Sequence, residues 1–354
     1  MDSRPHSAPG RGSIMSLVSL EVSVVEPTLT VHEMPSTPAS APSTSPVRRF
    51  GRLALIAVLV GGCADPSVTR DEADSATDMV GGEARSGAPM GAEVPDSSKA
   101  TRWETTFLDE FDTFDAANWQ DQSIWVNDED HCYVADGRHG TREVSDGTLK
   151  IRVVDLGAPV ECDSFSKTGV QHPPTQYVAG RIITKNRREF VKGRWSARLR
   201  VPDSGQDGMF PAWWLLGARN DEPPVEDPDE TVCWPMTGSG EIDVFEHHSD
   251  GGPDHYAVRA IDSDGTCGGG DWQRLMHVQS TDLAEWHEYA VEWDGPDLLF
   301  LLDGAVIFRS EGEGENFPEP LFAILNFAKI NAAEMTVPSW TMEVDWVKHE
   351  RRVE

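Results

Sequence analysis

The chain has few basic residues for its length. Its 354 residues include 30 Lys and Arg against 60 Asp and Glu, which gives a formal net charge of -30. Nucleic acids and anionic membrane surfaces need a basic face on a partner, so neither is expected here. The hydrophobic share of 38% excludes a polytopic membrane protein. Tyrosine is scarce, with 4 residues, whereas the 12 tryptophans supply wide rings that suit a large core or a groove for flat ligands.

Long apolar runs are also missing, and the clearest short one predicts export. Residues 53–60 are apolar, basic residues precede them within 48–52, and Gly-Gly-Cys63 follows. This order is typical of an export signal, and a run of eight is too short for a spanning helix of about 20 residues. The cysteine resembles the lipidated cysteine of bacterial lipoproteins. We therefore expect a lipoprotein-type signal at 48–63, and an exported protein that is either anchored to the cell envelope through Cys63 or secreted.

The segments around this signal do not predict a folded domain. Residues 1–47 are rich in Ser, Pro and Thr without periodicity, which indicates a disordered extension or a true start at Met15 or Met34. Residues 64–100 contain almost no large apolar side chain, so they cannot bury enough surface to fold and are expected to form a flexible acidic linker. The globular domain is expected at 101–354.

The globular part contains few cysteines, and their number is even. It has four cysteines, at 132, 162, 233 and 267. In an oxidising compartment an even number predicts two disulfides. Three pairings are possible, and proximity in the sequence favours Cys132–Cys162 and Cys233–Cys267. A zinc site is disfavoured because no Cys-x-x-Cys spacing occurs.

Residues 101–354 alternate between apolar and polar side chains and show no long helical period. In the segment 193–201, for example, Trp195 and Leu199 share one face. Asp303-Gly304 lies between two apolar runs, which is a strong hairpin signal. About a dozen short strands predict an all-β antiparallel sandwich formed as a single domain. A helix is expected only near 282–286.

The most informative segment is Glu241-Ile-Asp-Val-Phe-Glu246. In a regular strand Glu241 and Asp243 share a face and Glu246 points the other way. A bulge at Val244/Phe245 would return Glu246 to that face, so three carboxylates would line one groove. Two Glu side chains leaning together could then reach the separation of roughly 5–5.5 Å that a retaining glycosidase needs.

The residue types suit glycoside cleavage. Glu241 would attack the anomeric carbon and must be ionised, whereas Glu246 would protonate the leaving oxygen and must hold a proton, which a neighbouring negative charge promotes. Asp243 would hydrogen-bond Glu241 and hold its orientation. A calcium or magnesium site and a solvated acidic face are the alternatives, although charge repulsion makes a purely structural cluster expensive.

This segment resembles the bulged E-(I/L/V)-D-x-x-E signature of glycoside hydrolase family 16, laminarinase-like (β-1,3-glucanase) branch. The resemblance extends over residues 103–350, and its further motifs lie at 107–112 with Trp119, 177–185, 208–217, 234–240, 287–293, 325–326 and 344–347. It implies a jelly-roll sandwich of two curved antiparallel sheets with a concave substrate cleft, and a catalytic domain at 101–354. It also implies that Glu241 is the nucleophile, Asp243 the assisting carboxylate and Glu246 the acid/base.

The same resemblance implies five substrate-binding residues. Trp214 and Trp234 match tryptophans of the family cleft, and Phe210 stands where laminarinases usually carry Trp. Asn127 and Arg181 fall near family positions that bind sugar hydroxyls. Strand alternation requires that Trp213 and Trp214 face opposite sides, and the family match places Trp214 in the cleft.

Three departures from the family pattern are expected to alter the cleft. The acidic, proline-rich insertion at 221–231 should form a loop beside it, which disfavours a heavily sulfated polysaccharide. Arg259 or Asp262 stands in for a histidine that laminarinases usually have, and 329–331 replaces the usual Gly-Gly. The adjacent histidines at 247–248 are expected to be solvated at a strand end.

These features together predict a retaining endo-glycosidase that hydrolyses β-1,3- or mixed β-1,3/1,4-glucans. The alternatives are the same fold acting on agar-type galactans or as a transglycosylase, and a non-catalytic carbohydrate-binding surface protein. No cofactor is required, and the family resemblance allows a structural calcium ion. The expected partner is a polysaccharide, with membrane contact only through Cys63, and the protein is expected to be a monomer.

Overall fold

A computed structural model describes most of the globular part of the chain. The described residues are 102–127, 129–249, 252–262, 266–268, 275–330 and 333–353. The predictions for 1–47, 48–63 and 64–100, including the signal and Cys63, lie outside them. Within these described ranges no helix is both long and apolar enough to cross a membrane.

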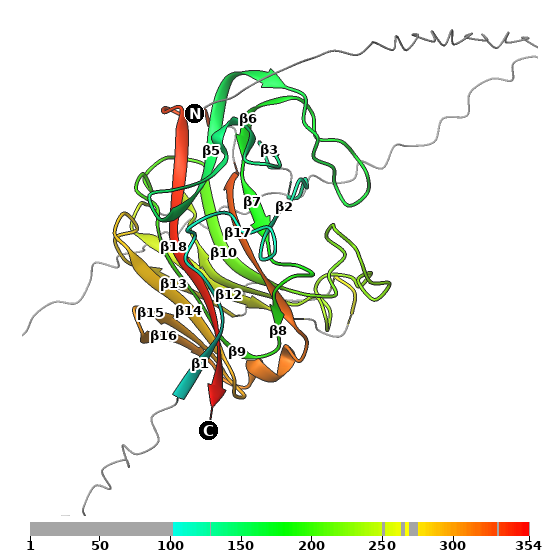
Figure 1. Cartoon of the computed structure of the whole chain (residues 1–354), viewed down its shortest axis with the longest axis vertical. Coiled ribbons are helices and arrows are strands. Elements are labelled where there is room, and N and C mark those ends of the chain that lie inside the picture. Colours follow the sequence, from blue (N-terminus) through cyan, green and yellow to red (C-terminus); the bar gives the residue numbers. More distant parts are fainter. Residues whose placement is uncertain are drawn as a thin grey trace, which may run out of the picture. The chain divides into compact units, whose positions relative to one another are not determined.

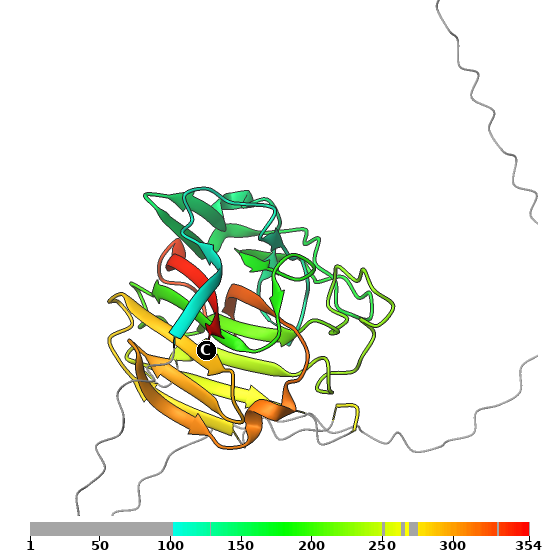
Figure 2. The same ribbon diagram turned by 60° about the horizontal axis from the view of Figure 1, so that its bottom comes forward.

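Two sheets form the fold, and Figures 1 and 2 show them as two layers. The ten-stranded sheet consists of β1 (Arg102–Asp109), β3 (Cys132–Tyr133), β4 (Arg142–Ser145), β5 (Thr148–Val160), β6 (Thr175–Ala179), β9 (Gly193–Arg200), β14 (His287–Trp293), β15 (Leu298–Leu302), β16 (Ala305–Ser310) and β18 (Ser339–Val353). The eight-stranded sheet consists of β2 (Gln120–Asp121), β7 (Arg181–Ile183), β8 (Glu189–Phe190), β10 (Met209–Gly217), β11 (Glu241–Glu246), β12 (His255–Ile261), β13 (Leu275–Ser280) and β17 (Leu321–Lys329). The predicted all-β antiparallel sandwich is confirmed.

The strand order places β11 well inside its sheet. The order of the eight-stranded sheet is β13-β12-β11-β10-β17-β7-β2, with β8 on β17, and that of the ten-stranded sheet is β16-β15-β14-β9-β18-β5-β6-β3, with β1 on β18 and β4 on β5. All pairs of named strands are antiparallel except β3 with β6. The predicted acidic strand is therefore flanked by β10 and β12, so its backbone is held on both sides.

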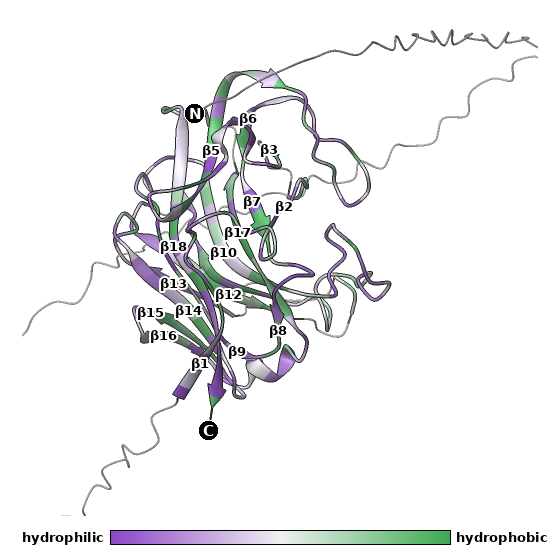
Figure 3. Cartoon of the chain, in the orientation of Figure 1, coloured by the Kyte–Doolittle hydropathy of each residue, from purple (hydrophilic) through white to green (hydrophobic). Residues whose placement is uncertain are grey.

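The core lies between the sheets and follows the predicted alternation. Trp195 and Leu199 of β9 are buried, as are Trp213 of β10 and Ile242 of β11, and all four belong to one cluster. Figure 3 shows hydrophobic residues on the strands and hydrophilic residues along many of the connecting loops. Because each inward face is used for the core, the opposite face of the eight-stranded sheet is left for a ligand.

The local predictions outside the core are mostly confirmed. Asp303 and Gly304 have φ values of 50° and 78° and join β15 to β16, as a two-residue hairpin turn requires. Disulfides join Cys132 to Cys162 and Cys233 to Cys267.

The helix expected at 282–286 is wrong. This segment is a turn in which the Ala284 amide donates to Asp282 Oδ1 over 3.0 Å, and β14 begins at His287. An aspartate side chain that hydrogen-bonds the backbone two residues later competes with a helix. Within the described residues, helical turns occur instead at η1 (Arg138–Gly140) and η3 (Glu313–Asn316), both of the 3-10 type.

Candidate active site

A cleft of about 640 Å³ lies on the face of the eight-stranded sheet that points away from the core. Its lining includes residues of β7, β10, β11 and β17 and of the loops beside them. All eight residues predicted from the sequence line it, namely Asn127, Arg181, Phe210, Trp214, Trp234, Glu241, Asp243 and Glu246. Residues far apart in the sequence are thus brought to one surface, as the sequence interpretation required.

The predicted bulge is present in β11. On the β10 side, Trp213 pairs with Phe245 and Trp214 with Asp243, so β11 has one extra residue there. Val244 and Phe245 are both buried in the core. Two successive residues therefore turn inward, and Glu246 returns to the cleft face beside Asp243.

Burial raises the pKa of all three cleft carboxyls. For Glu241 the pKa rises to about 8, mainly through burial and then through the negative charges of Glu246 and Glu222. For Asp243, which is 1% exposed, burial followed by the charges of its two neighbours holds the pKa well above its usual range. Burial also raises the pKa of Glu246, while Arg259 lowers it. The cluster therefore holds protons near neutral pH.

The origin of these shifts differs in one respect from the sequence interpretation. We expected a neighbouring negative charge to keep Glu246 protonated, but burial has that effect, and the Arg259 guanidinium, at 3.5 Å from Glu246, opposes it. A side-chain hydrogen bond between Asp243 and Glu241 lowers the pKa of Glu241 and raises that of Asp243. Asp243 is thus suited to carry a proton and donate it in a hydrogen bond to an ionised Glu241.

The aromatic residues divide as predicted. Trp213 is buried in the core, and Trp214 lines the cleft, where its Nε1 donates to Asn326 Oδ1 over 2.7 Å. Trp234 is 40% exposed at the cleft. Phe210 packs on the ring of His248, with a centroid distance of 4.1 Å. The cleft therefore offers several aromatic surfaces on which a sugar ring could stack.

The two predicted polar ligands have different surroundings. Asn127 is exposed and has a φ of 55°. Arg181 is 2% exposed, and its guanidinium donates to Gln122 Oε1 over 2.5 Å and to Glu222 Oε2 over 2.7 Å. Two donor groups of Arg181 are therefore already bound by protein atoms.

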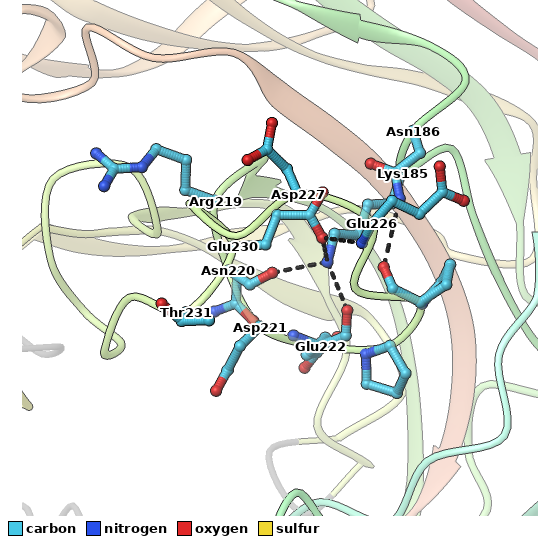
Figure 4. Close-up of polar contacts among 12 residues, drawn as sticks. Lys185, Asn186, Arg219, Asn220, Asp221, Glu222, Glu226, Asp227, Glu230 and Thr231 are labelled. Carbon is cyan, nitrogen blue, oxygen red and sulfur yellow. Dashed lines mark hydrogen bonds and ion pairs between the residues drawn. The ribbon is translucent and has the colours of Figure 1, made fainter.

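The acidic insertion lies beside the cleft, as predicted. Asp221, Glu222 and Thr231 contribute to the cleft lining. The insertion is tied to the sheet by Lys185, which follows β7 and has a fully buried side chain that forms an ion pair of 2.9 Å with Glu230 (Figure 4). Glu222 and Glu230 are buried near the two ends of this loop, whereas residues 225–229 between them are exposed to solvent.

The two histidines at 247–248 were predicted to be solvated, and this prediction is wrong for His247. Its side chain is buried, and its ring nitrogens lie 2.8 Å from the carbonyl oxygens of Ser204 and His255. Because the bulge turns Glu246 to the cleft, the next residue points to the interior. His248 is partly buried against Phe210.

The residues that line the cleft but were not predicted as site residues include Trp125, Glu129 and Glu222. Burial raises the pKa of Glu129 to about 8, and its Oε2 has no hydrogen-bond partner within the described residues. The proximity of Trp125 and Glu129 to Asn127 in the sequence could have indicated the first two. Of the two residues proposed to replace the family histidine, Arg259 lies near Glu246, whereas Asp262 accepts a hydrogen bond from Asn316 over 2.7 Å.

No group of three or more His, Cys, Asp or Glu side chains in the described part of the chain is arranged to hold a metal ion. The structural calcium allowed by the family resemblance stays a prediction.

Comparisons with known proteins give glucanases among the relatives of this chain and laminarinases among its structural neighbours. The chain is 25% identical over 269 residues to the glucan endo-1,3-beta-glucosidase A1 of Niallia circulans, covering 68% of this chain and 36% of that protein. It is 28% identical over 240 residues to a beta-glucanase of Rhodothermus marinus, covering 63% of this chain and 71% of that protein. The catalytic domain of a laminarinase from Thermotoga petrophila has the same fold, with a TM-score of 0.56, 20% identity and coverage of 72% of this chain and 100% of that one.

A second structural neighbour, LamA from Zobellia galactanivorans in complex with laminaritriose and laminaritetraose, has a TM-score of 0.59 at 23% identity, covering 71% of this chain and all of that one. The fold is therefore the jelly roll of these laminarinases. The model of the family "Glycosyl hydrolases family 16" matches residues 120–348, which include every strand from β2 to β17 and most of β18. Because this match covers more than half of the chain, the chain belongs to glycosyl hydrolases family 16.

Proposed function

We propose that the protein is a retaining endo-glycosidase that hydrolyses β-1,3- or mixed β-1,3/1,4-glucans. The observation that carries this proposal is the β11 bulge, which aligns Glu241, Asp243 and Glu246 along one face of an aromatic-lined cleft. The relatives named as a glucan endo-1,3-beta-glucosidase and a beta-glucanase support the substrate class. The matched segment spans 36% of the first relative and 71% of the second, so the activity of either whole protein is not transferred by the match alone.

In the first step, ionised Glu241 attacks the anomeric carbon while Glu246 gives its proton to the glycosidic oxygen. The carbon–oxygen bond breaks, the leaving chain departs as an alcohol, and a glycosyl ester forms on Glu241. Asp243 donates a hydrogen bond to Glu241, which fixes the attacking oxygen and stabilises the anion before attack.

In the second step, Glu246 is ionised and takes a proton from water. The water oxygen attacks the anomeric carbon and displaces Glu241, so two inversions give net retention. Arg259, at 3.5 Å from Glu246, favours this ionised state. Burial favours the protonated state needed for the first step, so the two influences together allow Glu246 to act in both directions.

The same site could act on agar-type galactans or transfer the glycosyl unit to a sugar hydroxyl instead of water. A non-catalytic carbohydrate-binding protein is less well supported, because binding alone does not need three carboxyls held close together on one face of the cleft. The acidic insertion beside the cleft favours a neutral glucan over a sulfated chain.

The test is a substrate panel of laminarin, lichenan and agarose, with product sizes and reducing ends measured over time. We expect the wild type to release oligosaccharides of several lengths early in the digestion of laminarin or lichenan. The rate of reducing-end release should fall at least about 100-fold in Glu241→Gln and in Glu246→Gln. Products longer than the substrate would indicate transglycosylation. Binding to laminarin without new reducing ends in the wild type would support the non-catalytic alternative and refute the enzyme.

The second part of the proposal concerns location. The basic and apolar pattern at 48–63 supports export, with lipid attachment at Cys63. In a bacterial host, the wild type should partition with membranes and Cys63→Ser should not. Equal partitioning of both would argue against the anchor.

A further inference from the structure

The insertion at 221–231 is fixed to the sheet at its beginning. Lys185 Nζ donates to the carbonyl oxygens of Asn220 over 2.7 Å and Glu222 over 2.6 Å, and pairs with the Glu230 carboxylate. Asn220 Oδ1 accepts the Glu222 amide over 2.9 Å. Figure 4 shows these groups gathered around the Lys185 side chain. The backbone of Glu222 is therefore held in place before its side chain is considered.

The Glu222 side chain reaches from this loop to β7. Its carboxylate accepts a hydrogen bond of 2.7 Å from Arg181, and the exposed fractions of the two side chains are 2% for Arg181 and 8% for Glu222. Gln122 accepts a second hydrogen bond from Arg181 and donates one to the Pro223 carbonyl. A buried guanidinium bound at two positions has one fixed orientation.

The fixed guanidinium lies over Trp214. The Arg181 Cζ atom is 5.0 Å from the centre of the Trp214 ring, a cation–π distance, and Asn326 holds the indole Nε1. Tyr133 in turn accepts a hydrogen bond of 3.0 Å from Asn326. One face and one edge of the indole are thus occupied by protein, and Trp214 still lines the cleft.

We infer that the Arg181–Glu222 pair is a positioning unit, through which the insertion holds the Trp214 ring as a sugar-stacking surface. Arg181 then acts on substrate through Trp214, in place of the direct sugar contact predicted from the sequence. The inference rests on the proposed function, because it assigns Trp214 to the binding of that glucan.

The position of Glu222 also has an electrostatic consequence. Glu241 is faced by Glu246 and Asp243 from its own strand, by Arg259 from β12, and by Glu222 from the insertion. The negative charge of Glu222 raises the pKa of Glu241. Neutralising Glu222 should therefore lower the pKa of Glu241 and move the acidic limb of the pH–activity curve to lower pH.

Three single variants separate the positioning of the Trp214 ring from the electrostatic effect of Glu222 on Glu241. Glu222→Gln removes the charge and weakens the hold on Arg181. Arg181→Lys keeps the charge but loses the planar group that stacks on the indole. Glu226→Gln is the matched control, since it removes the same charge from an exposed position of the same loop. Melting temperatures confirm that each variant is folded.

With laminarin as substrate, Glu222→Gln and Arg181→Lys should each raise KM about three- to tenfold, in the range of a lost cation–π contact, with kcat within about twofold of the wild type. Only Glu222→Gln should move the acidic limb to lower pH, and Glu226→Gln should change neither quantity. The double variant of Arg181 and Glu222 should raise KM no further than the single ones, because both act on one ring.

If the wild type releases no reducing ends from laminarin, the proposed function fails. If the wild type is active and both variants match Glu226→Gln in KM and in the acidic limb, the positioning unit is refuted while the function stands. A fall in kcat at unchanged KM would equally refute it, since a stacking surface acts on binding. Should Glu222→Gln not fold, the KM of Arg181→Lys decides the question.

Discussion

Replacing Arg259 with methionine should shift the whole pH–activity curve to higher pH and widen it. The Arg259 guanidinium lies 3.5 Å from Glu246 Oε2 and lowers the pKa of Glu246, against the effect of burial. It also lowers the pKa of Glu241, where it ranks after burial and the charges of Glu246 and Glu222. Methionine is similar in length and removes the charge, so both pKa values should rise, that of Glu246 by more.

The expected shift follows from the distance between the two groups. Two unit charges 3.5 Å apart interact by roughly 1.2 kcal/mol in bulk water and roughly 4.7 kcal/mol at an effective dielectric constant of 20. The side chains of Arg259 and Glu246 are 12% and 10% exposed, so the true value lies between these limits. Removing this attraction should raise the pKa of Glu246, and at about 1.4 kcal/mol per tenfold change the limb of the pH–activity curve that Glu246 controls should move up by about one to three pH units.

The assay is kcat/KM on laminarin as a function of pH. Glu246 must be protonated for the first step, so its pKa sets the basic limb, and Glu241 must be ionised, so its pKa sets the acidic limb. We expect the basic limb of Arg259→Met to move up by about one to three pH units and the acidic limb to move up by less. Arg259→Lys keeps the charge, so both limbs of its pH–activity curve should lie near those of the wild type. A basic limb that is fixed or moves to lower pH would refute the assignment of Glu246 as the acid.

Three further outcomes are expected. Stability should fall as pH rises from about 6.5 to 8, because Glu241 and Glu129 have folded-state pKa values of about 8 and bind protons more tightly when folded. Below about pH 6.5 the lowered pKa values of the buried His131 and His349, about 3 and about 4, oppose this slope. Melting temperatures across this range test the slope, and Glu241→Gln should flatten it. Glu246→Gln should keep a melting temperature at pH 7 at or above that of the wild type, since a neutral amide replaces a buried acid, and a large drop would argue for a structural role. Removing the Cys132–Cys162 disulfide, which spans 30 residues, should lower the free energy of unfolding by about 3–4 kcal/mol in urea titrations, whereas no change would mean that the bond is not formed.

Local patterns in the sequence were sufficient for the strands. Alternation along 193–201 predicts which side of β9 faces the core, because side chains of a strand alternate between its two faces. The Asp303-Gly304 turn was predictable for a similar reason, since a tight hairpin needs residues that tolerate positive φ. The helix expected at 282–286 failed because five residues carry too little periodic signal to outweigh one side-chain hydrogen bond.

The sequence by itself determined the strand pattern, the favoured cysteine pairs and the bulged acidic strand with Glu241, Asp243 and Glu246, because each depends on residues close together in the chain. Only the tertiary structure decided which charges surround those acids. Arg259 reaches Glu246 through the pairing of β11 with β12, and Glu222 reaches Arg181 through a loop that is anchored to Lys185, 35 or more residues earlier in the chain. Such contacts depend on strand register and loop path, which no short stretch of sequence specifies, and they set the pKa values on which the proposed chemistry depends.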